Sequence, residues 1–264
     1  MHPVYPPYRS RYLPAMTRDE IEMLPGKHAA VVILPIGAIE QHGPHLPVGT
    51  DSVLAQAWLD AIMNDLPARI PAYVAPTMAY GKSNEHQGFP GTLSLSTATL
   101  RRTLLAAADQ LLNWGFRTMA VLNTHGGNSS VIVSTLREIQ TMHGMNAGML
   151  RPPMTCSESA RENTYGFHAG EVETSLMLAI APERVEMGKA VTEYPARIGD
   201  PGEVRLAGAP ATHSWMTSDL SKSGVMGDAK AATPEKGRKW LKEGSRELAE
   251  QIIRLSNEVA RRGN

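Results

Sequence analysis

The stretch FRTMAVLNTHGGNSSVIVSTLREIQTMH, residues 116–143, decides the fold class of this chain. It begins with a short apolar run, residues 116–123, of the kind found in a strand that is buried on both faces of a parallel sheet. Residues 129–143 then place apolar side chains at helical spacing. The stretch therefore predicts a buried strand that leads through a short loop into a helix.

The segment before this stretch predicts another helix. Residues 97–114 place leucines on one stripe, which is typical of a helix that packs on a core. Ser96 or Thr97 can cap its first turn, and Gly115 can end it. The order along this part of the chain is therefore helix, strand, helix.

Similar patterns occur in the rest of the chain. AAVVILPIG, residues 29–37, predicts a second strand buried on both faces. Helical spacing is found in residues 52–66, 171–181 and 234–260. Alternating strands and helices predict an α/β fold with a parallel or mostly parallel sheet and helices on both faces. In such sheets, ligands bind where strands end.

The length of 264 residues fits one large α/β domain, so we expect a single domain over residues 1–264. The first 14 residues carry four prolines and three tyrosines. They predict an extended N-terminal arm, of a kind that often lies on a neighbouring subunit. Residues 192–233 are rich in Gly, Pro, Ser and Thr, which predicts a loop region.

The charge balance argues against several classes of partner. Lys and Arg together number 26, as do Asp and Glu, so no net field attracts nucleic acid or an anionic membrane, and a small-molecule substrate is the expected partner. The chain has no apolar run of about 18 residues and no signal-like N-terminus. Cys156 is the single cysteine and forms no internal disulfide. We therefore expect a cytoplasmic protein.

The first motif that carries chemistry is IGAIEQHGPHLPVGTD, residues 36–51, directly after the first predicted strand. Glu40 and His42 are two positions apart, so in extended backbone both side chains point the same way. Asp51 stands at the start of the next helix, after glycines and prolines that let the loop fold back. The motif predicts two ligands of one metal site and a carboxylate that could bridge two ions.

The second motif is NTHGGN, residues 123–128, which again follows a buried strand. Its paired glycines allow close approach of the backbone, and His125 is its one titratable group, which predicts a further metal ligand. Imidazole and carboxylate ligands without thiolate favour zinc, manganese or iron over calcium or an iron–sulfur cluster. With so many candidate ligands, two ions are plausible.

The third motif is FHAGEVETS, residues 167–175, where His168 precedes a predicted helix. Glu171 and Glu173 fall in the first turns of that helix and point in different directions, so at most one faces the site. We select Glu173 as the further acid.

A glycine-containing loop, YGKSNEHQGFPGT at residues 80–92, could close one wall of the pocket. It carries Ser83, Glu85 and His86. A lone histidine is more often a surface or core residue than a catalyst. This interpretation is applied to His86, His143 and His213. His45 lies within the first motif, where shaping the loop is an alternative role.

IEQHGPHLPVGTD, NTHGGN and HAGEVETS, in this order and separation, resemble the creatininase (creatinine amidohydrolase) family. The match runs from about residue 30 to residue 180, with a weaker match at residues 224–237. The resemblance implies a three-layer α/β/α fold and homohexamers built as trimers of dimers. It also implies a binuclear zinc or manganese centre that hydrolyses C–N bonds in cyclic or linear amides.

The resemblance also implies roles for single residues. Those that match the family's metal ligands are Glu40, His42, Asp51 as the bridge, and His125. His168 matches the histidine that donates a proton to the leaving nitrogen, and Glu173 matches the acid five residues beyond it.

Two departures from creatininase itself concern the substrate. Creatininase has a glutamate ligand where this chain has Gly127, so one metal either needs another acid, for which Glu173 is the candidate, or is bound weakly. Creatininase closes a tryptophan over its substrate where this chain has Thr164, and Trp215 is a candidate substitute. These departures argue against creatinine as the substrate.

Three functions follow from the sequence. The first is an amidohydrolase with two metal ions. The second is a ring-opening hydrolase of a cyclic ketone such as an inosose, or a peptidase-type relative, that uses the same metals. The third is a metal-binding relative without turnover, against which His168 argues, because a binder has little need of a proton donor.

Overall fold

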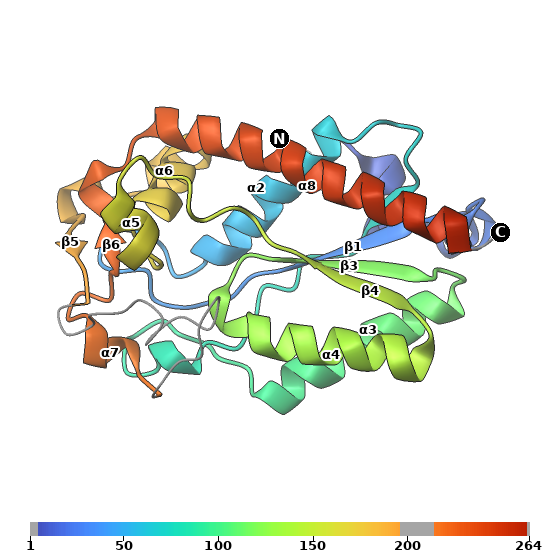
Figure 1. Ribbon diagram of the computed structural model, residues 1–264, viewed down its shortest axis with the longest axis horizontal. Helices are drawn as coiled ribbons and strands as arrows, with labels where there is room; N and C mark the ends of the chain where they lie inside the picture. Colours follow the sequence, from blue (N-terminus) through green and yellow to red (C-terminus); the bar gives the residue numbers. More distant parts are fainter. Residues whose placement is uncertain (1–4, 196–213, 263–264) are drawn as a thin grey trace.

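The computed structural model describes residues 5–195 and 214–262, and of residues 259–262 the backbone alone. At its centre is a parallel sheet whose strands lie in the order β2-β1-β3-β4. The strands are β1 (Val31–Ile36), β2 (Ala72–Val74), β3 (Thr118–Asn123) and β4 (Asn146–Leu150). The sheet therefore contains the two predicted strands at its centre and two further strands at its edges (Figure 1).

Long helices cover both faces of this sheet. They are α2 (Thr50–Asp65), α3 (Thr97–Asn113), α4 (Ser129–His143), α6 (Glu171–Ile180) and α8 (Pro234–Arg262). Figure 1 shows α3 and α4 on one face and α2, α6 and α8 on the other. Val31 and Ile33 of β1 belong to the buried cluster on the α2 side, and Val32 and Leu34 to the one on the α3 side, as a pleated strand requires. The predicted three-layer α/β/α fold is confirmed.

The ends of α3 show how closely the sequence sets an element. The side chain of Ser96 accepts a hydrogen bond from the main-chain nitrogen of Thr99 at 3.1 Å, which caps the first turn. Gly115, just beyond the last turn, has a φ of 97°, a backbone conformation that favours glycine. The predicted helix over residues 97–114 is therefore confirmed to within one residue.

Shorter elements connect these layers. The short α-helices and the remaining strands are α1 (Arg18–Met23), α5 (Ala160–Tyr165), α7 (Thr217–Leu220), β5 (Thr192–Glu193) and β6 (Gly227–Asp228). The 3-10 helices are η1 (Arg9–Arg11), η2 (Leu13–Ala15), η3 (Lys27–Ala29), η4 (Asn84–His86), η5 (Gly126–Asn128), η6 (Pro182–Arg184), η7 (Met187–Lys189) and η9 (Ala229–Ala231). None of the helices in the described ranges combines the length and the apolar character needed to cross a membrane.

The N-terminal segment differs from the predicted extended arm. Its described part, residues 5–14, contains η1 and the start of η2, because proline is accommodated in the first turn of a helix, where Pro14 lies. Leu13 is buried in the core, and the hydroxyl of Tyr8 donates to Asp60 of α2 at 2.7 Å. These contacts hold the segment against its own chain.

The predicted loop region, residues 192–233, contains short regular elements in its described parts. β5 and β6 pair antiparallel, with Thr192 beside Asp228, and α7 lies between them in the sequence. Residues 196–213 lie outside the described part of the chain.

The sheet order places the first two motifs together. The chain runs from β1 to β2 on one side and then returns to β3 on the other, so the carboxyl ends of β1 and β3 form a topological switch point. Ile36 and Asn123, the last residues of these strands, are register partners. The loops that follow them therefore start side by side.

Candidate metal centre

The five predicted metal ligands meet at this edge of the sheet. Glu40 and His42 lie in the loop after β1, Asp51 lies in the first turn of α2, His125 follows β3, and Glu173 lies in the first turn of α6. All five side chains are buried. The site is thus assembled from four separate segments of the chain.

Asp51 lies between two histidines. Its Oδ1 is 3.3 Å from Nε2 of His42, and its Oδ2 is 3.3 Å from Nδ1 of His125. Oε2 of Glu40 is 3.1 Å from the same nitrogen of His125, and Oε2 of Glu173 is 3.9 Å from Nε2 of His42. Two triads that share Asp51 result, one with Glu40 and His125 and the other with His42 and Glu173. Asp51 is therefore placed where one carboxylate could bridge two ions.

Both histidines turn one ring nitrogen to a main-chain carbonyl. Nδ1 of His42 lies 3.0 Å from the carbonyl oxygen of Glu40, and Nε2 of His125 lies 2.9 Å from that of Lys82. A carbonyl oxygen can only accept, so these two nitrogens carry hydrogen and donate it. In the neutral rings, the other nitrogens direct lone pairs at the acids, which is the arrangement of histidine ligands to a metal.

Buried polar atoms without a hydrogen-bond partner line the centre of the site. Both carboxylate oxygens of Glu40, Nε2 of His42 and Oδ2 of Asp51 are buried and make no hydrogen bond within the described part of the chain. Such atoms are costly to bury unless they bind a cation or a proton. Imidazole and carboxylate together suit zinc, manganese or iron. The residues therefore fit a divalent metal centre.

The cluster of carboxylates in the site favours the binding of positive charge. Burial opposes the charge of His42, but the carboxylates of Asp51, Glu173 and Glu40 outweigh it and raise the pKa of this imidazole to about 10. Burial, with the nearby charges of Asp51 and Glu40, raises the pKa of Glu173 to about 7 although His42 opposes the shift. Without metal, protons compensate part of the negative charge that cations would otherwise neutralise.

His168 lies beside Glu40 and His42 at the same centre. Its Nε2 lies 2.8 Å from the carbonyl oxygen of Gln41 and therefore donates a hydrogen bond. Its Nδ1 lies 3.6 Å from Oε1 of Glu40, and its ring centre is 4.4 Å from that of His42. In the neutral ring, the unprotonated nitrogen thus faces the acids, where it can accept and return a proton.

The two acids at the start of α6 have different surroundings. Oε2 of Glu173 accepts a hydrogen bond from the main-chain nitrogen of Ala169 at 2.6 Å and faces the site. Glu171 instead contacts the hydroxyl of Ser157 and the ammonium of Lys236. Ala169 has a φ of 53°, which is unusual for a residue with a side chain. This strained position directs the chain between His168 and Glu173.

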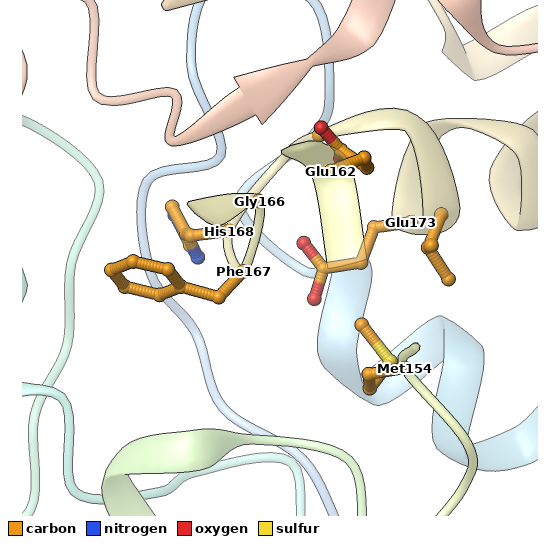
Figure 2. A pocket seen from close by; sticks show the side chains of 8 residues that line it. Met154, Glu162, Gly166, Phe167, His168 and Glu173 are labelled. Atoms are coloured by element: carbon orange, nitrogen blue, oxygen red, sulfur yellow. The ribbon is translucent and has the colours of Figure 1, made fainter. Parts of the chain in front are cut away.

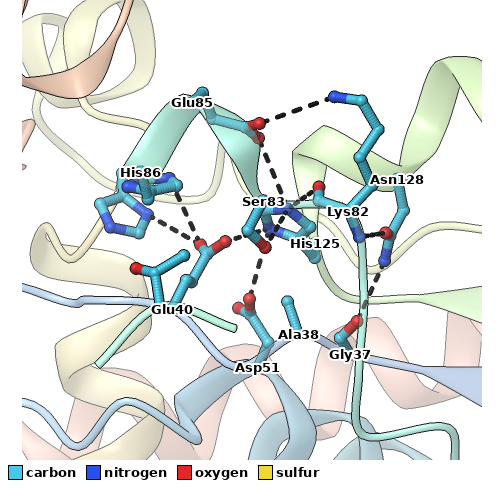
Figure 3. Close-up of polar contacts among 12 residues, drawn as sticks. Gly37, Ala38, Glu40, Asp51, Lys82, Ser83, Glu85, His86, His125 and Asn128 are labelled. Atoms are coloured by element: carbon cyan, nitrogen blue, oxygen red, sulfur yellow. Dashed lines mark hydrogen bonds and ion pairs between the residues drawn. The ribbon is translucent and has the colours of Figure 1, made fainter. Parts of the chain in front are cut away.

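The loop over residues 80–92 lies against the site, as predicted, and brings His86 there, in contrast to the interpretation of this histidine as a core or surface residue. Nε2 of His86 lies 3.5 Å from Oε1 of Glu40, and its Nδ1 lies 2.9 Å from the side-chain nitrogen of Gln41 and 3.0 Å from the hydroxyl of Thr217. His86 is therefore part of the wall of the site (Figure 3). Its position within a motif-like loop, beside Glu85, was the available signal in the sequence.

The remaining histidines differ in their surroundings. His143 ends α4 and pairs with Asp109 at 2.8 Å, away from the acids of the site. His45 is buried, with its Nε2 2.9 Å from the hydroxyl of Thr174. His213 lies outside the described residues.

A recess borders the site next to His168 and Glu173. Met154, Glu162 and Phe167 line it together with these two residues (Figure 2). The ring of Trp215 packs edge-on against Phe167 at 6.1 Å between centres. Phe167, which precedes His168 in the sequence, thus forms an aromatic pair with Trp215.

The sequence of this chain is similar to that of proteins from one known family. The sequence profile of the creatininase family, described as creatinine amidohydrolase, matches residues 14–252. The mycofactocin precursor peptide peptidase of Mycolicibacterium smegmatis is 33% identical over 226 residues, which cover 85% of each chain. The creatinine amidohydrolase of Pseudomonas putida is 30% identical over 266 residues, which cover 92% of this chain and 96% of the relative.

The structure is also similar to solved structures of the same family. A solved structure described as "Creatininase Mn" is similar with a TM-score of 0.74 and 28% identity, over 92% of this chain and 97% of the other. Sequence and fold thus match along most of the chain, beyond the three motifs. This protein belongs to the creatininase family of hydrolases.

Proposed function

We propose that this protein hydrolyses a C–N amide bond with two divalent metal ions. One ion would be held by Glu40, Asp51 and His125, and the other by His42, Asp51 and Glu173. The observation that carries the proposal is the convergence on Asp51 of buried ligand atoms that lack hydrogen bonds, with both histidines held through carbonyl groups.

The metal ions, when bound, would polarise the amide carbonyl and lower the pKa of a water molecule that attacks it. The role of the chain is to hold the reacting groups and to move protons. Nδ1 of His168 faces the centre, while its Nε2 is held by the carbonyl oxygen of Gln41. His168 would take a proton at Nδ1 and deliver it to the leaving nitrogen, as in general acid–base catalysis.

The identity of the metal is proposed from the ligands. Zinc, manganese and iron suit two imidazoles with three carboxylates, and a relative with manganese has been solved. We propose zinc or manganese, with two ions per chain. The homohexamer inferred from the family remains a prediction.

The names of two similar proteins suggest amide substrates to test. The peptide peptidase acts on a linear amide, and creatinine amidohydrolase acts on a cyclic one. Thr164 on α5 is not aromatic and gives no cover for a flat ring, so the pair of Phe167 and Trp215 provides the aromatic groups at the recess. A linear amide is the first substrate to test, because a peptide peptidase is among the similar proteins, and a cyclic amide is the second.

The test combines metal content with hydrolysis. Purified wild-type protein, Asp51→Asn and a control, Asp19→Asn, are analysed by mass spectrometry for metals and assayed with a panel of peptides, cyclic amides and an inosose. Asp19 is a suitable control because its carboxylate is 72% exposed and far from the site in sequence. We expect about two metal ions per chain in the wild type and the control, and loss of metal and activity in Asp51→Asn. Wild-type protein that binds no metal would overturn the proposal.

A further inference from the structure

The space beside His125 is occupied by a carboxylate from another segment of the chain. Position 127 is glycine, and a β-carbon built there would lie 2.0 Å from Oε1 of Glu85 and 2.5 Å from Nε2 of His125. A side chain at position 127 and the carboxylate of Glu85 therefore exclude each other. The absence of a side chain at Gly127 opens the room in which Glu85 approaches His125.

Glu85 reaches this space from η4, in the loop over residues 80–92. Its Oε1 lies 3.5 Å from Nε2 of His125, and its Oε2 lies 3.7 Å from the ammonium of Lys82. The side chain is 16% exposed and lies at the margin of the site. Figure 3 shows Glu85 beside the imidazole of His125, on the side opposite Asp51.

The nitrogen that Glu85 approaches is the one that donates. Nε2 of His125 donates to the carbonyl oxygen of Lys82, while Nδ1 faces Glu40 and Asp51. A negative charge beside the distal N–H of an imidazole fixes its tautomer and makes the opposite nitrogen a stronger ligand. The carboxylate lies between two cationic or donor groups, with the ammonium of Lys82 3.7 Å from Oε2 and the N–H nitrogen of His125 3.5 Å from Oε1.

We propose that Glu85 is a positioning residue that orients His125 and strengthens its Nδ1 as a ligand of one of the two metal ions. The inference rests on the proposed function and assigns to Glu85 a role beyond it. The carboxylate acts through His125 and does not touch the metal. Gly127 is part of this arrangement, because the absence of a side chain there leaves room for the carboxylate of Glu85.

A competing explanation is that Glu85 only anchors the loop through its ion pair with Lys82. The two roles can be separated by substitution. Glu85→Gln keeps the shape of the side chain and removes its charge, whereas Lys82→Met removes the ion pair and leaves the carboxylate beside His125. Glu183→Gln is the matched control, since this glutamate is 71% exposed.

The experiment measures the affinity of the metal-free protein for Zn²⁺ by competition with a chromophoric chelator, with far-UV circular dichroism to verify the fold. We expect Glu85→Gln to bind one of its two ions roughly 10- to 100-fold more weakly, as for other groups that support a ligand. Lys82→Met and Glu183→Gln should bind both ions like the wild type. The visible spectrum of the Co²⁺ form should change in Glu85→Gln alone.

Two results would overturn the inference. If wild-type protein binds two ions and Glu85→Gln binds them equally well, Glu85 has no positioning role. If Lys82→Met loses as much affinity as Glu85→Gln, the loop anchor explains the effect. Wild-type protein without affinity for Zn²⁺, and equally without affinity for Mn²⁺, would overturn the proposed function itself, so the two failures are distinguishable.

Discussion

Oδ1 of Asp51 lies 3.3 Å from Nε2 of His42, and both side chains are buried. Asp51 is shared by the candidate triad with His42 and the candidate triad with His125. Under the proposed function, substitutions that leave Asp51 intact should therefore remove the two ions one at a time.

Glu173→Gln should remove one ion and retain the other. Glu173 belongs to the triad with His42, whereas the triad with Glu40 does not include it. Metal analysis is expected to give about one ion per chain. The matched variant is Glu171→Gln on the same helix, which loses its charged contact with Lys236 and should lower the melting temperature while two ions remain bound. Equal metal content in Glu173→Gln and wild type would contradict the assignment.

His168→Gln should reduce turnover more than metal binding. The imidazole is placed to move protons, and removal of such a group costs about 100-fold or more in rate. We expect kcat to fall by this factor, with two ions retained per chain. If the variant instead loses an ion, His168 is a ligand, a role that its 3.6 Å approach to Glu40 would also allow.

Gly127→Ala should destabilise the protein, because its β-carbon would lie 2.0 Å from Glu85 and 2.5 Å from the carbonyl oxygen of Lys82. Overpacking of this kind costs about 1–3 kcal/mol of the free energy of unfolding. The neighbouring Gly126→Ala is the control, since a β-carbon there meets nothing within 4 Å. Urea unfolding of the metal-free proteins measures both changes, and equal effects of the two variants would argue against a crowded position 127.

Metal affinity should rise with pH. The acids around His42 raise the pKa of its imidazole to about 10 although burial opposes its charge, so near neutral pH the metal-free ring holds a proton that a metal must displace. Calorimetry in buffers of different ionisation enthalpy counts the protons released when Zn²⁺ binds. A count of zero between about pH 7 and 9 would be inconsistent with this shift.

The metal-free protein should show the opposite dependence in its stability. A pKa raised from about 6.5 in the unfolded chain stabilises the folded state fully below that value. This contribution of His42 is then lost as the pH rises through about 10. Urea unfolding of the metal-free protein is expected to show a lower free energy of unfolding at pH 9 than at pH 7, and a constant or rising value would contradict it.

The fold was largely predictable because its central strands are unusually clear in the sequence. Residues 29–37 and 116–123 are continuous apolar runs, and they form β1 and β3 in the middle of the sheet. The edge strands β2 and β4 carry no such signal, since β2 has three residues and β4 is only partly buried. Edge strands are defined by their neighbours more than by their own composition.

The site was predictable to the extent that its residues follow strand ends. Glu40 and His125 come after β1 and β3, and the register of these strands brings them together. The positions of Glu85 and His86 depend on η4, a 3-10 helix of three residues, which is too short to give a periodic pattern in the sequence. The folded-back N-terminal segment was not predicted either, because its packing depends on contacts such as that between Tyr8 and Asp60.

The hydrogen bond between His168 and the carbonyl oxygen of Gln41 spans 127 positions of the sequence, and the contact of His125 with Glu40 also joins distant segments. The proposed metal site is therefore complete only in the folded chain. An ion that binds the folded state alone, at 100 times its dissociation constant, would add about 2.7 kcal/mol to the stability. Under the proposed function, the metal would thus stabilise the fold as well as serve the reaction.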